Sequence, residues 1–307
     1  MKRSVAIAAE TESAVPPPQR GPRRRVASVA VIGGGPGGAV VAAHLARAGV
    51  QVAVFAQNKR PPILIGESLV PAVVPILRDM GVESEVAGYS IRKTGATFVF
   101  NSRERLNIRF DDVRGATTTY SYNVPRDRFD ATLLAAAGKA GARIIDLAAR
   151  VERCPDSERV ILDPGSLAAT RDLFGEDGPD FIVDATGRKR TIARILDLPC
   201  ETGPRRDTAL HAHVVGVEVE VWGNVHTDRL DRGWAWRIPL PGRVSVGIVV
   251  DAEALESCGA TLEEQYDNFV RRDSILGPWI APATRVTPVV RWSNYQLSVS
   301  RGSTARF

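Results

Sequence analysis

Several protein classes are excluded by what the sequence lacks. It has no apolar run near the roughly 20 residues that cross a bilayer, and its N-terminal stretch lacks the apolar core of a signal peptide. Only three cysteines occur, Cys154, Cys200 and Cys258, with no C-x-x-C pair and an odd total that fits no closed disulfide framework. We therefore expect a cytoplasmic protein with reduced thiols and no membrane association.

Lysine is also scarce, with five residues against 35 arginines, so a lysine inside a distinctive motif carries more weight than usual. The formal net charge is +5, and residues 1–25, with six basic and two acidic side chains, account for +4 of it. We expect this segment to be a disordered basic tail. Because the remaining charge is +1, we expect no nucleic-acid partner.

A glycine-rich turn organises the N-terminal half of the chain. An apolar strand pattern at residues 29–32 leads into it, and an alanine-rich helix pattern over residues 36–48 follows. The first, third and sixth positions of the turn match the G-x-G-x-x-G spacing, in which the glycines permit the tight bend, the approach of a pyrophosphate and close helix packing. The helix N-terminus would face the phosphates. The predicted cofactor-binding residues here are Gly33, Gly35, Pro36, Gly37 and Gly38.

Residues 51–55 form a second strand pattern, so the turn belongs to a β-α-β unit with a parallel, right-handed connection. Such units usually place a carboxylate after the second strand to bind a ribose hydroxyl. Here Gln57 and Asn58 stand in its place, and we expect Gln57 to make this contact. Asp184 and Gly187 follow a further strand of the same sheet, at the edge where ligands collect.

From Thr208 onward, long alternating strands dominate, at residues 209–218, 233–240, 244–250 and 285–292, with a helix over 261–272. The sequence therefore predicts an α/β fold in which a mainly antiparallel sheet lies beside the nucleotide-binding sheet. We expect a nucleotide-binding domain over 26–205, with inserted strands around 91–124, and a second domain over 206–307.

Five motifs support a family resemblance. Residues 66–71 read G-E-S-L-V-P, 93–98 K-T-G-A-T-F, 124–130 V-P-R-D-R-F-D, 183–188 V-D-A-T-G-R and 233–239 G-W-A-W-R-I-P. Together with the glycine turn, they resemble the flavin-dependent halogenases, especially those acting on phenols, pyrroles and carrier-bound aromatic rings. The W-x-W-x-I-P motif is the most specific, and the resemblance runs from about residue 26 to the end of the chain.

This resemblance implies a fold and a chemistry. The fold would be an FAD-binding Rossmann-like domain with a mainly antiparallel substrate-side sheet, as in aromatic hydroxylases. Reduced FAD from a partner flavin reductase, O2 and chloride or bromide would give hypohalous acid. Trp234 and Trp236 would form a wall between flavin and substrate. Lys93 would relay the halogen to an electron-rich aromatic ring, free or bound to a carrier protein.

Each site residue also has a simpler interpretation. Trp234 and Trp236 share a strand face and could be core residues, and Lys93 could be a surface lysine at a strand start. Burial of Lys93 would instead lower its pKa and favour the neutral amine. Glu67 and Ser68 could line the route between flavin and substrate, or Ser68 could cap the next helix. Arg126 could contact the cofactor or be an ordinary first-turn arginine.

His211 and His213 also share a strand face, but no third metal ligand is evident, so we expect satisfied sheet residues and no metal site.

The chain departs from the family pattern at its last residues. The family continues with a G-D-A segment that binds the flavin, and residues 302–307 stand where that segment should begin. We therefore expect the chain to correspond to the N-terminal portion of a halogenase. Two alternatives stay open at this point: an FAD-dependent aromatic hydroxylase, which would need neither Lys93 nor the tryptophan wall, and a catalytically silent flavoprotein fragment.

Overall fold

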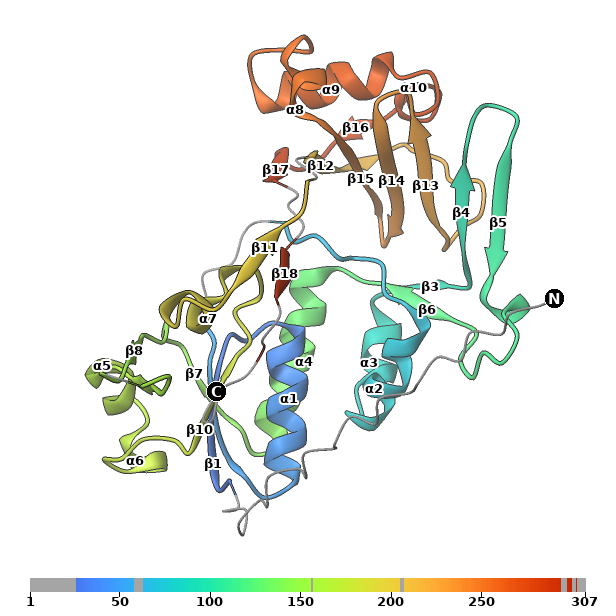
Figure 1. Ribbon diagram of the computed structural model, residues 1–307. Coiled ribbons are helices and arrows are strands. Elements are labelled where there is room, and N and C mark those ends of the chain that lie inside the picture. Colours follow the sequence, from blue (N-terminus) through green and yellow to red (C-terminus); the bar gives the residue numbers. More distant parts are fainter. Residues whose placement is uncertain are drawn as a thin grey trace, which may run out of the picture.

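The computed structural model describes residues 26–57, 63–155, 157–204, 207–293, 297–299 and 302. The predicted basic tail and Asn58 lie outside the described residues. The fold is built on two main sheets: a parallel sheet in the lower half of Figure 1 and a larger, mainly antiparallel sheet in its upper half. The α/β fold with a second, mainly antiparallel sheet is therefore confirmed.

The smaller sheet is the predicted nucleotide-binding unit. Its four strands are all parallel, in the order β10-β1-β2-β7, and the central strands are apolar on both faces, as a doubly covered parallel sheet requires. Helices α1 and α4 pack together on one face, and the core of the other face includes α7, β8 and β9. The elements are β1 (Ser28–Ile32), α1 (Pro36–Arg47), β2 (Gln51–Phe55), α4 (Arg126–Lys139), β7 (Arg143–Ile145), β8 (Val151–Arg153), β9 (Val160–Leu162), α5 (Pro164–Ala168), α6 (Arg171–Phe174), β10 (Phe181–Asp184) and α7 (Thr191–Ile195).

The larger sheet contains the three long strands predicted after Thr208, and one that the sequence pattern hid. The hidden strand is β13, in which His226 and Asp228 are fully buried, so buried polar residues mask the usual alternation. The strand predicted over residues 285–292 is two short strands, because Pro288 between them has no N–H to donate. The elements are β12 (Asp207–Val215), β13 (Val225–Leu230), β14 (Gly233–Leu240), β15 (Arg243–Asp251), β16 (Thr284–Arg285) and β17 (Val290–Ser293).

Strands from the first half of the chain complete this sheet. The inserted hairpin of β4 (Gly95–Val99) and β5 (Arg105–Arg109) joins it through a parallel pairing of β4 with β13. Short strands β3 (Ile91–Lys93) and β6 (Ser121–Asn123) pair with each other beneath the hairpin. The two halves of the sequence are thus interlocked, while the domain boundary at 205/206 stays a prediction.

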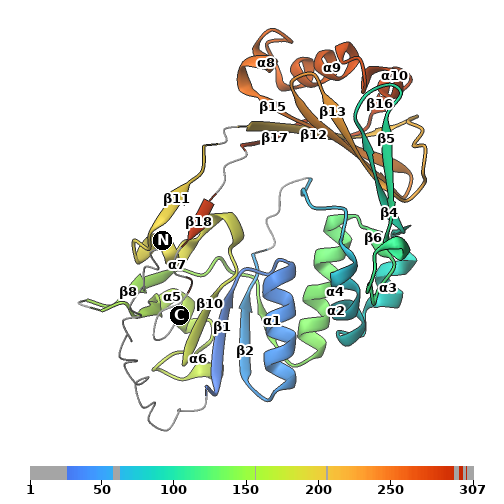
Figure 2. The same cartoon turned by 45° about the vertical axis from the view of Figure 1, so that its right-hand side comes forward.

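Helices cover the outer face of the larger sheet (Figure 2). The main one is α9 (Leu262–Arg272), whose predicted start is confirmed by a capping box between Thr261 and Glu264. Within the described residues, no helix combines the length and apolar character that crossing a membrane requires. The remaining elements are η1 (Pro71–Val73), α2 (Val74–Asp79), α3 (Glu83–Gly88), η2 (Phe110–Asp112), η3 (Gly187–Lys189), β11 (Cys200–Thr202), α8 (Ala252–Glu256), α9 (Leu262–Arg272), α10 (Gly277–Ile280) and β18 (Leu297–Val299).

Candidate active site

The glycine turn between β1 and α1 leaves open space where a diphosphate would approach. Gly33 has φ +114°, and a Cβ there would lie 2.4 Å from the carbonyl oxygen of Ala185. A Cβ on Gly38 would lie 2.0 Å from the carbonyl oxygen of Gly33. Both positions therefore require glycine for packing. Around Gly35 and Gly37, by contrast, a Cβ would meet no atom within 4 Å.

The start of α1 suits an anion. Its N-cap is Gly35, no side chain caps it, Pro36 occupies the first turn, and that turn contains no acidic residue. The N–H groups of a helix start and the positive end of its dipole attract phosphate. The residues present therefore fit the diphosphate of a dinucleotide cofactor.

Asp184, Gly187 and Gln57 lie at the carboxyl edge of the same sheet. The Asp184 carboxylate accepts hydrogen bonds from the backbone N–H groups of Thr186 (3.0 Å) and Ile192 (2.8 Å), so it orders the segment after β10. Gly187 and Gln57 are exposed, and Gly187 has φ +59°. Their contact with a cofactor stays a prediction.

Arg126, in the first turn of α4, anchors the loop of residues 63–70. Its guanidinium donates to Asp130 (2.9 Å) and to the carbonyl oxygen of Ile65. The next loop residue, Gly66, has φ +97°, and a Cβ there would lie 2.7 Å from the Arg126 guanidinium. Arg126 therefore fixes the path of this loop, while a direct contact with a cofactor stays a prediction.

Lys93, at the end of β3, is buried with 4% of its surface exposed. Its Nζ donates to Ser68 Oγ (2.8 Å) and to the carbonyl oxygen of Leu69 (2.9 Å). Burial lowers the pKa of Lys93 to about 8, because desolvation disfavours the charged amine. The interpretation of Lys93 as a surface lysine is therefore wrong.

Ser68 does not cap the helix that follows it. The short helix η1 begins at Pro71 with Val70 as its N-cap, and no side chain caps it. The alternative role of Ser68 as a helix cap is therefore wrong. Its hydroxyl is directed instead to the amine of Lys93, because the loop pairs with Asn123 of β6, beside β3.

Trp234 and Trp236 share one face of β14, as predicted. Their ring centroids are 5.8 Å apart with an interplanar angle of 47°. Trp236 is 8% exposed and Trp234 is 37% exposed, so the pair joins a buried ring to an accessible one. The Trp236 indole lies over Gly247 of β15, and its Nε1 donates to Ser245 Oγ (3.3 Å).

Glu67 and His213 form a buried pair between the loop and the larger sheet. Glu67 Oε1 lies 2.7 Å from His213 Nε2, and the side chains are 4% and 5% exposed. His213 is therefore satisfied, as predicted. His211 is buried on the same face with its ring 5.9 Å from that of Trp236, and burial lowers its pKa to about 4, so it is neutral. Its ring nitrogens make no hydrogen bond to the described residues, so the expectation that His211 is satisfied like His213 is wrong.

The part of the chain that the structure describes contains no group of three His, Cys, Asp or Glu side chains placed to hold a metal ion. The sequence did not indicate the Glu67–His213 pair, because 146 positions separate its members. The glycine under Trp236 did leave a signal, since a glycine inside a strand pattern marks close approach by another group.

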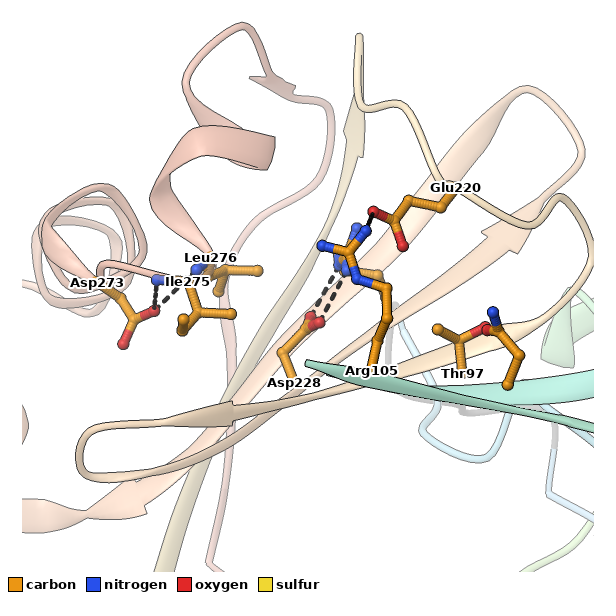
Figure 3. A network of polar contacts seen from close by, with 9 residues as sticks. Thr97, Arg105, Glu220, Asp228, Asp273, Ile275 and Leu276 are labelled. Carbon is orange, nitrogen blue, oxygen red and sulfur yellow. Dashed lines mark hydrogen bonds and ion pairs between the residues drawn. The ribbon is translucent and has the colours of Figure 1, made fainter. Parts of the chain in front are cut away.

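A second polar group lies on the opposite face of the larger sheet, among the covering helices. Arg237 makes two hydrogen bonds of 2.8 Å to Asp228, and both side chains are fully buried. Figure 3 shows Asp228 in this network, with Arg105 and Glu220 paired beside it. The tryptophan motif thus alternates between two environments: Trp234 and Trp236 face the candidate site, and Arg237 faces the helices.

Comparisons with known proteins show the family of the chain. The family model of the FAD binding domain matches residues 26–250. The tryptophan 2-halogenase of Chondromyces crocatus is 29% identical over 87% of this chain and 52% of its own. The 1H-pyrrole-2-carbonyl-[peptidyl-carrier protein] chlorinase of Pseudomonas fluorescens is 26% identical over 85% of this chain and 64% of its own.

A solved structure, that of the myxobacterial chondrochloren halogenase, is also similar. It superposes with a TM-score of 0.75 and 26% identity, over 89% of this chain and 65% of its own. The chain thus spans about half to two thirds of the length of these three relatives. The chain belongs to the FAD binding domain family and, within it, groups with the flavin-dependent halogenases.

Proposed function

We propose that this chain carries the FAD-binding and halogen-transferring part of a flavin-dependent halogenase. Bound reduced FAD, with O2 and chloride or bromide, would supply hypohalous acid. The turn from Gly33 to Gly38 would hold the FAD diphosphate, with Gln57, Asp184 and Gly187 along the same sheet edge. The observation that carries the proposal is the burial of Lys93 against the loop of residues 63–70. This loop contacts the face of the larger sheet on which Trp234 and Trp236 lie.

Lys93 would move the halogen. Its pKa of about 8 leaves an appreciable fraction of neutral amine near neutral pH, and a neutral amine has the lone pair that a cation lacks. Nζ can hydrogen-bond hypohalous acid, or attack its halogen so that an N–halogen bond forms, the O–halogen bond breaks and water leaves. An electron-rich ring carbon would then take the halogen: the C–halogen bond forms, the N–halogen bond breaks, the ring loses a proton and the nitrogen gains one, which restores the amine.

The neighbours of Lys93 would orient it. Ser68 Oγ and the Leu69 carbonyl accept two of its N–H bonds, which leaves the remaining valence of the nitrogen for the halogen donor. Trp234 and Trp236 would keep the organic substrate apart from the flavin, so that the oxidant meets halide first. Glu67 would line the route between the two regions.

The partners follow from the same chemistry. A flavin reductase would supply the reduced cofactor, and the substrate would be an electron-rich aromatic compound, free or bound to a carrier protein. Two relatives are named for action on tryptophan and on a carrier-bound pyrrole, which supports this class of substrate. The cysteines are all free, which supports a reducing compartment such as the cytoplasm.

Replacement of Lys93 tests the proposal on the full-length protein. With a flavin reductase, halide and a panel of phenols, indoles and pyrroles, we expect Lys93→Ala to lose at least 100-fold in halogenated product, measured by mass spectrometry. Lys139→Ala, at an exposed lysine of α4, is the matched control and should keep wild-type turnover. Undiminished halogenation by Lys93→Ala would refute the role of Lys93 as the residue that moves the halogen. An oxygenated product from the wild type, with no halogenated one, would refute the proposal and favour the hydroxylase.

A further inference from the structure

A continuous path of contacts joins Lys93 to Trp236. Lys93 is held by Ser68 and Leu69, and the residue before them, Glu67, contacts His213 of β12. In the register of the larger sheet, His213 lies directly across from Ser245 of β15. Ser245 Oγ in turn accepts the hydrogen bond of the Trp236 indole. His213 thus stands between the loop that holds the lysine and the strand that supports the tryptophan.

We infer that His213 is a positioning residue, which acts through Glu67 to hold Lys93 in place opposite the tryptophan pair. The inference rests on the proposed function for its catalytic meaning. His213 does not touch the amine of Lys93, so its effect would pass entirely through the loop.

The other anchors of the loop lead elsewhere. Arg126 ties Ile65 to α4, and backbone hydrogen bonds tie the loop to the segment that begins with β6: Val124 N–H to the Glu67 carbonyl (2.7 Å) and Leu69 N–H to the Tyr122 carbonyl (2.9 Å). Of the hydrogen bonds that the loop makes to described residues, the one between Glu67 and His213 reaches the larger sheet. Without this hydrogen bond, the loop would stay attached to α4 and β6, but its position relative to β14, the strand of Trp236, would no longer be fixed.

His213 itself is rigidly held. Its backbone N–H donates to Thr287 Oγ1 (2.9 Å), its carbonyl accepts from Val286 N–H (2.9 Å), and β12 pairs with β15 along its length. A side chain on such a strand is a fixed point for a loop. Both members of the pair are almost fully buried, so an unpaired Glu67 carboxylate would be costly and would turn toward water. That movement would carry Ser68 and Leu69 away from Lys93 and admit water to the amine.

The accessibility and pKa of Lys93 report this movement directly. The chain has only five lysines, so peptide mapping after limited acetylation assigns the rate of each amine without ambiguity. In the wild type we expect slow labelling of Lys93 with a midpoint near pH 8. In His213→Leu, we expect labelling at least 10-fold faster, with the midpoint shifted at least one pH unit upward. His213→Gln, which keeps a donor near Glu67, should restore most of the wild-type behaviour.

A matched control uses a second buried histidine. His226→Leu makes the same substitution in the same sheet, on the face that packs against the helices, and should leave the labelling of Lys93 unchanged. An unchanged rate and midpoint for Lys93 in a folded His213→Leu variant would overturn the inference. Should His213→Leu not fold, Glu67→Ala, which removes the other member of the pair, takes its place with the same two outcomes.

Acetylation needs no flavin turnover, so the two proposals fail separately. If His213→Leu alters Lys93 labelling but the wild type does not halogenate, the positioning role stands and the proposed function falls. If halogenation depends on Lys93 but His213→Leu leaves the labelling of Lys93 unchanged, the proposed function stands and the positioning role falls. In an active enzyme, His213→Leu should lower kcat by at least 10-fold while the Kd for FAD stays within twofold, because the cofactor turn lies on the other sheet.

Discussion

The indole of Trp236 lies directly on Gly247 of the neighbouring strand. A Cβ at position 247 would lie between 2.1 and 2.4 Å from three carbons of the ring, which is closer than such atoms ever approach. The glycine is therefore what lets the indole lie flat across the sheet, within reach of Ser245. The orientation of the Trp236 ring is thus set by a residue with no side chain.

Gly247→Ala should displace this ring. We expect a loss of about 1–3 kcal/mol in the free energy of unfolding, because an overpacked site forces neighbouring side chains from their preferred rotamers. The near-UV circular dichroism of tryptophan should change together with the urea midpoint. Gly88→Ala, at an exposed position where a Cβ meets no atom within 4 Å, is the control and should stay within about 0.5 kcal/mol of the wild type. Equal stability of both variants would contradict this account.

The two kinds of glycine in the nucleotide turn should separate binding from folding. Gly35→Val places a side chain in open space at an extended backbone position, so the melting temperature should change little while the affinity for FAD falls at least 10-fold. Gly38→Ala pushes a methyl group against the Gly33 carbonyl, so the melting temperature itself should fall by several degrees. A titration followed by flavin fluorescence, with thermal unfolding of each variant, distinguishes the two. Loss of FAD binding in neither variant would remove the turn from the cofactor site.

Burial of Lys93 should make stability depend on pH. Its pKa in the folded state, about 8, lies below the ordinary value of 10.5, so the unfolded chain binds the proton more tightly. Unfolding is therefore favoured at low pH, and stability from this group rises as the pH increases from about 8 to about 10.5. In this range, the slope of the unfolding free energy against pH approaches at most about 1.4 kcal/mol per pH unit. Urea titrations at pH 7 to 10 give the free energy of unfolding of the wild type and of Lys93→Met. The value for the wild type should rise relative to that of the variant as the pH rises. A constant difference would mean that the amine is already neutral or well solvated.

The buried pair of Asp228 and Arg237 should be essential to the larger sheet. Arg237→Met leaves a carboxylate with no exposed surface and no cationic partner, which costs about 3–5 kcal/mol. The double variant Asp228→Leu/Arg237→Met removes both charges and should recover much of that loss. Denaturant unfolding of the single and double variants measures the difference. A double variant less stable than Arg237→Met would show that the pair contributes more than mutual compensation of charge.

Local patterns predicted the nucleotide-binding unit well. Its strand, turn and helix follow each other directly in sequence, and the roles of Gly33, Gly35 and Gly38 depend on neighbours only a few residues away or on one adjacent strand. The tryptophan pair and Lys93 were found through short motifs in the same way. Helices and strands in which apolar residues recur at a regular spacing were predictable for the same reason.

What escaped prediction depends on distant partners. Strand β13 was missed because its inward positions hold the polar residues His226 and Asp228, which are buried beside Arg237 of the next strand and Thr97 of the distant strand β4. The sequence left Ser68 open between a helix cap and a place on the route between flavin and substrate, because the group that it meets, Lys93, belongs to a distant strand. The Glu67–His213 pair required knowledge of how the two sheets face each other. None of these relations has a local sequence signal.

The parallel pairing of β4 with β13 has a consequence for how the chain acquires its structure during synthesis. Ala96 has its partner, Val225, about 130 residues further on, so the ribosome must add all of them before the hairpin can join its sheet. At about 5–20 residues per second, this takes roughly 6 to 26 seconds. Throughout that interval, the hairpin presents an unpaired edge together with Leu106 and Ile108, which are exposed even in the finished fold. The nascent protein is therefore most exposed to misassociation while β7 and β10 of the nucleotide-binding sheet are still being added, and a chaperone that shields apolar strands would act on it then.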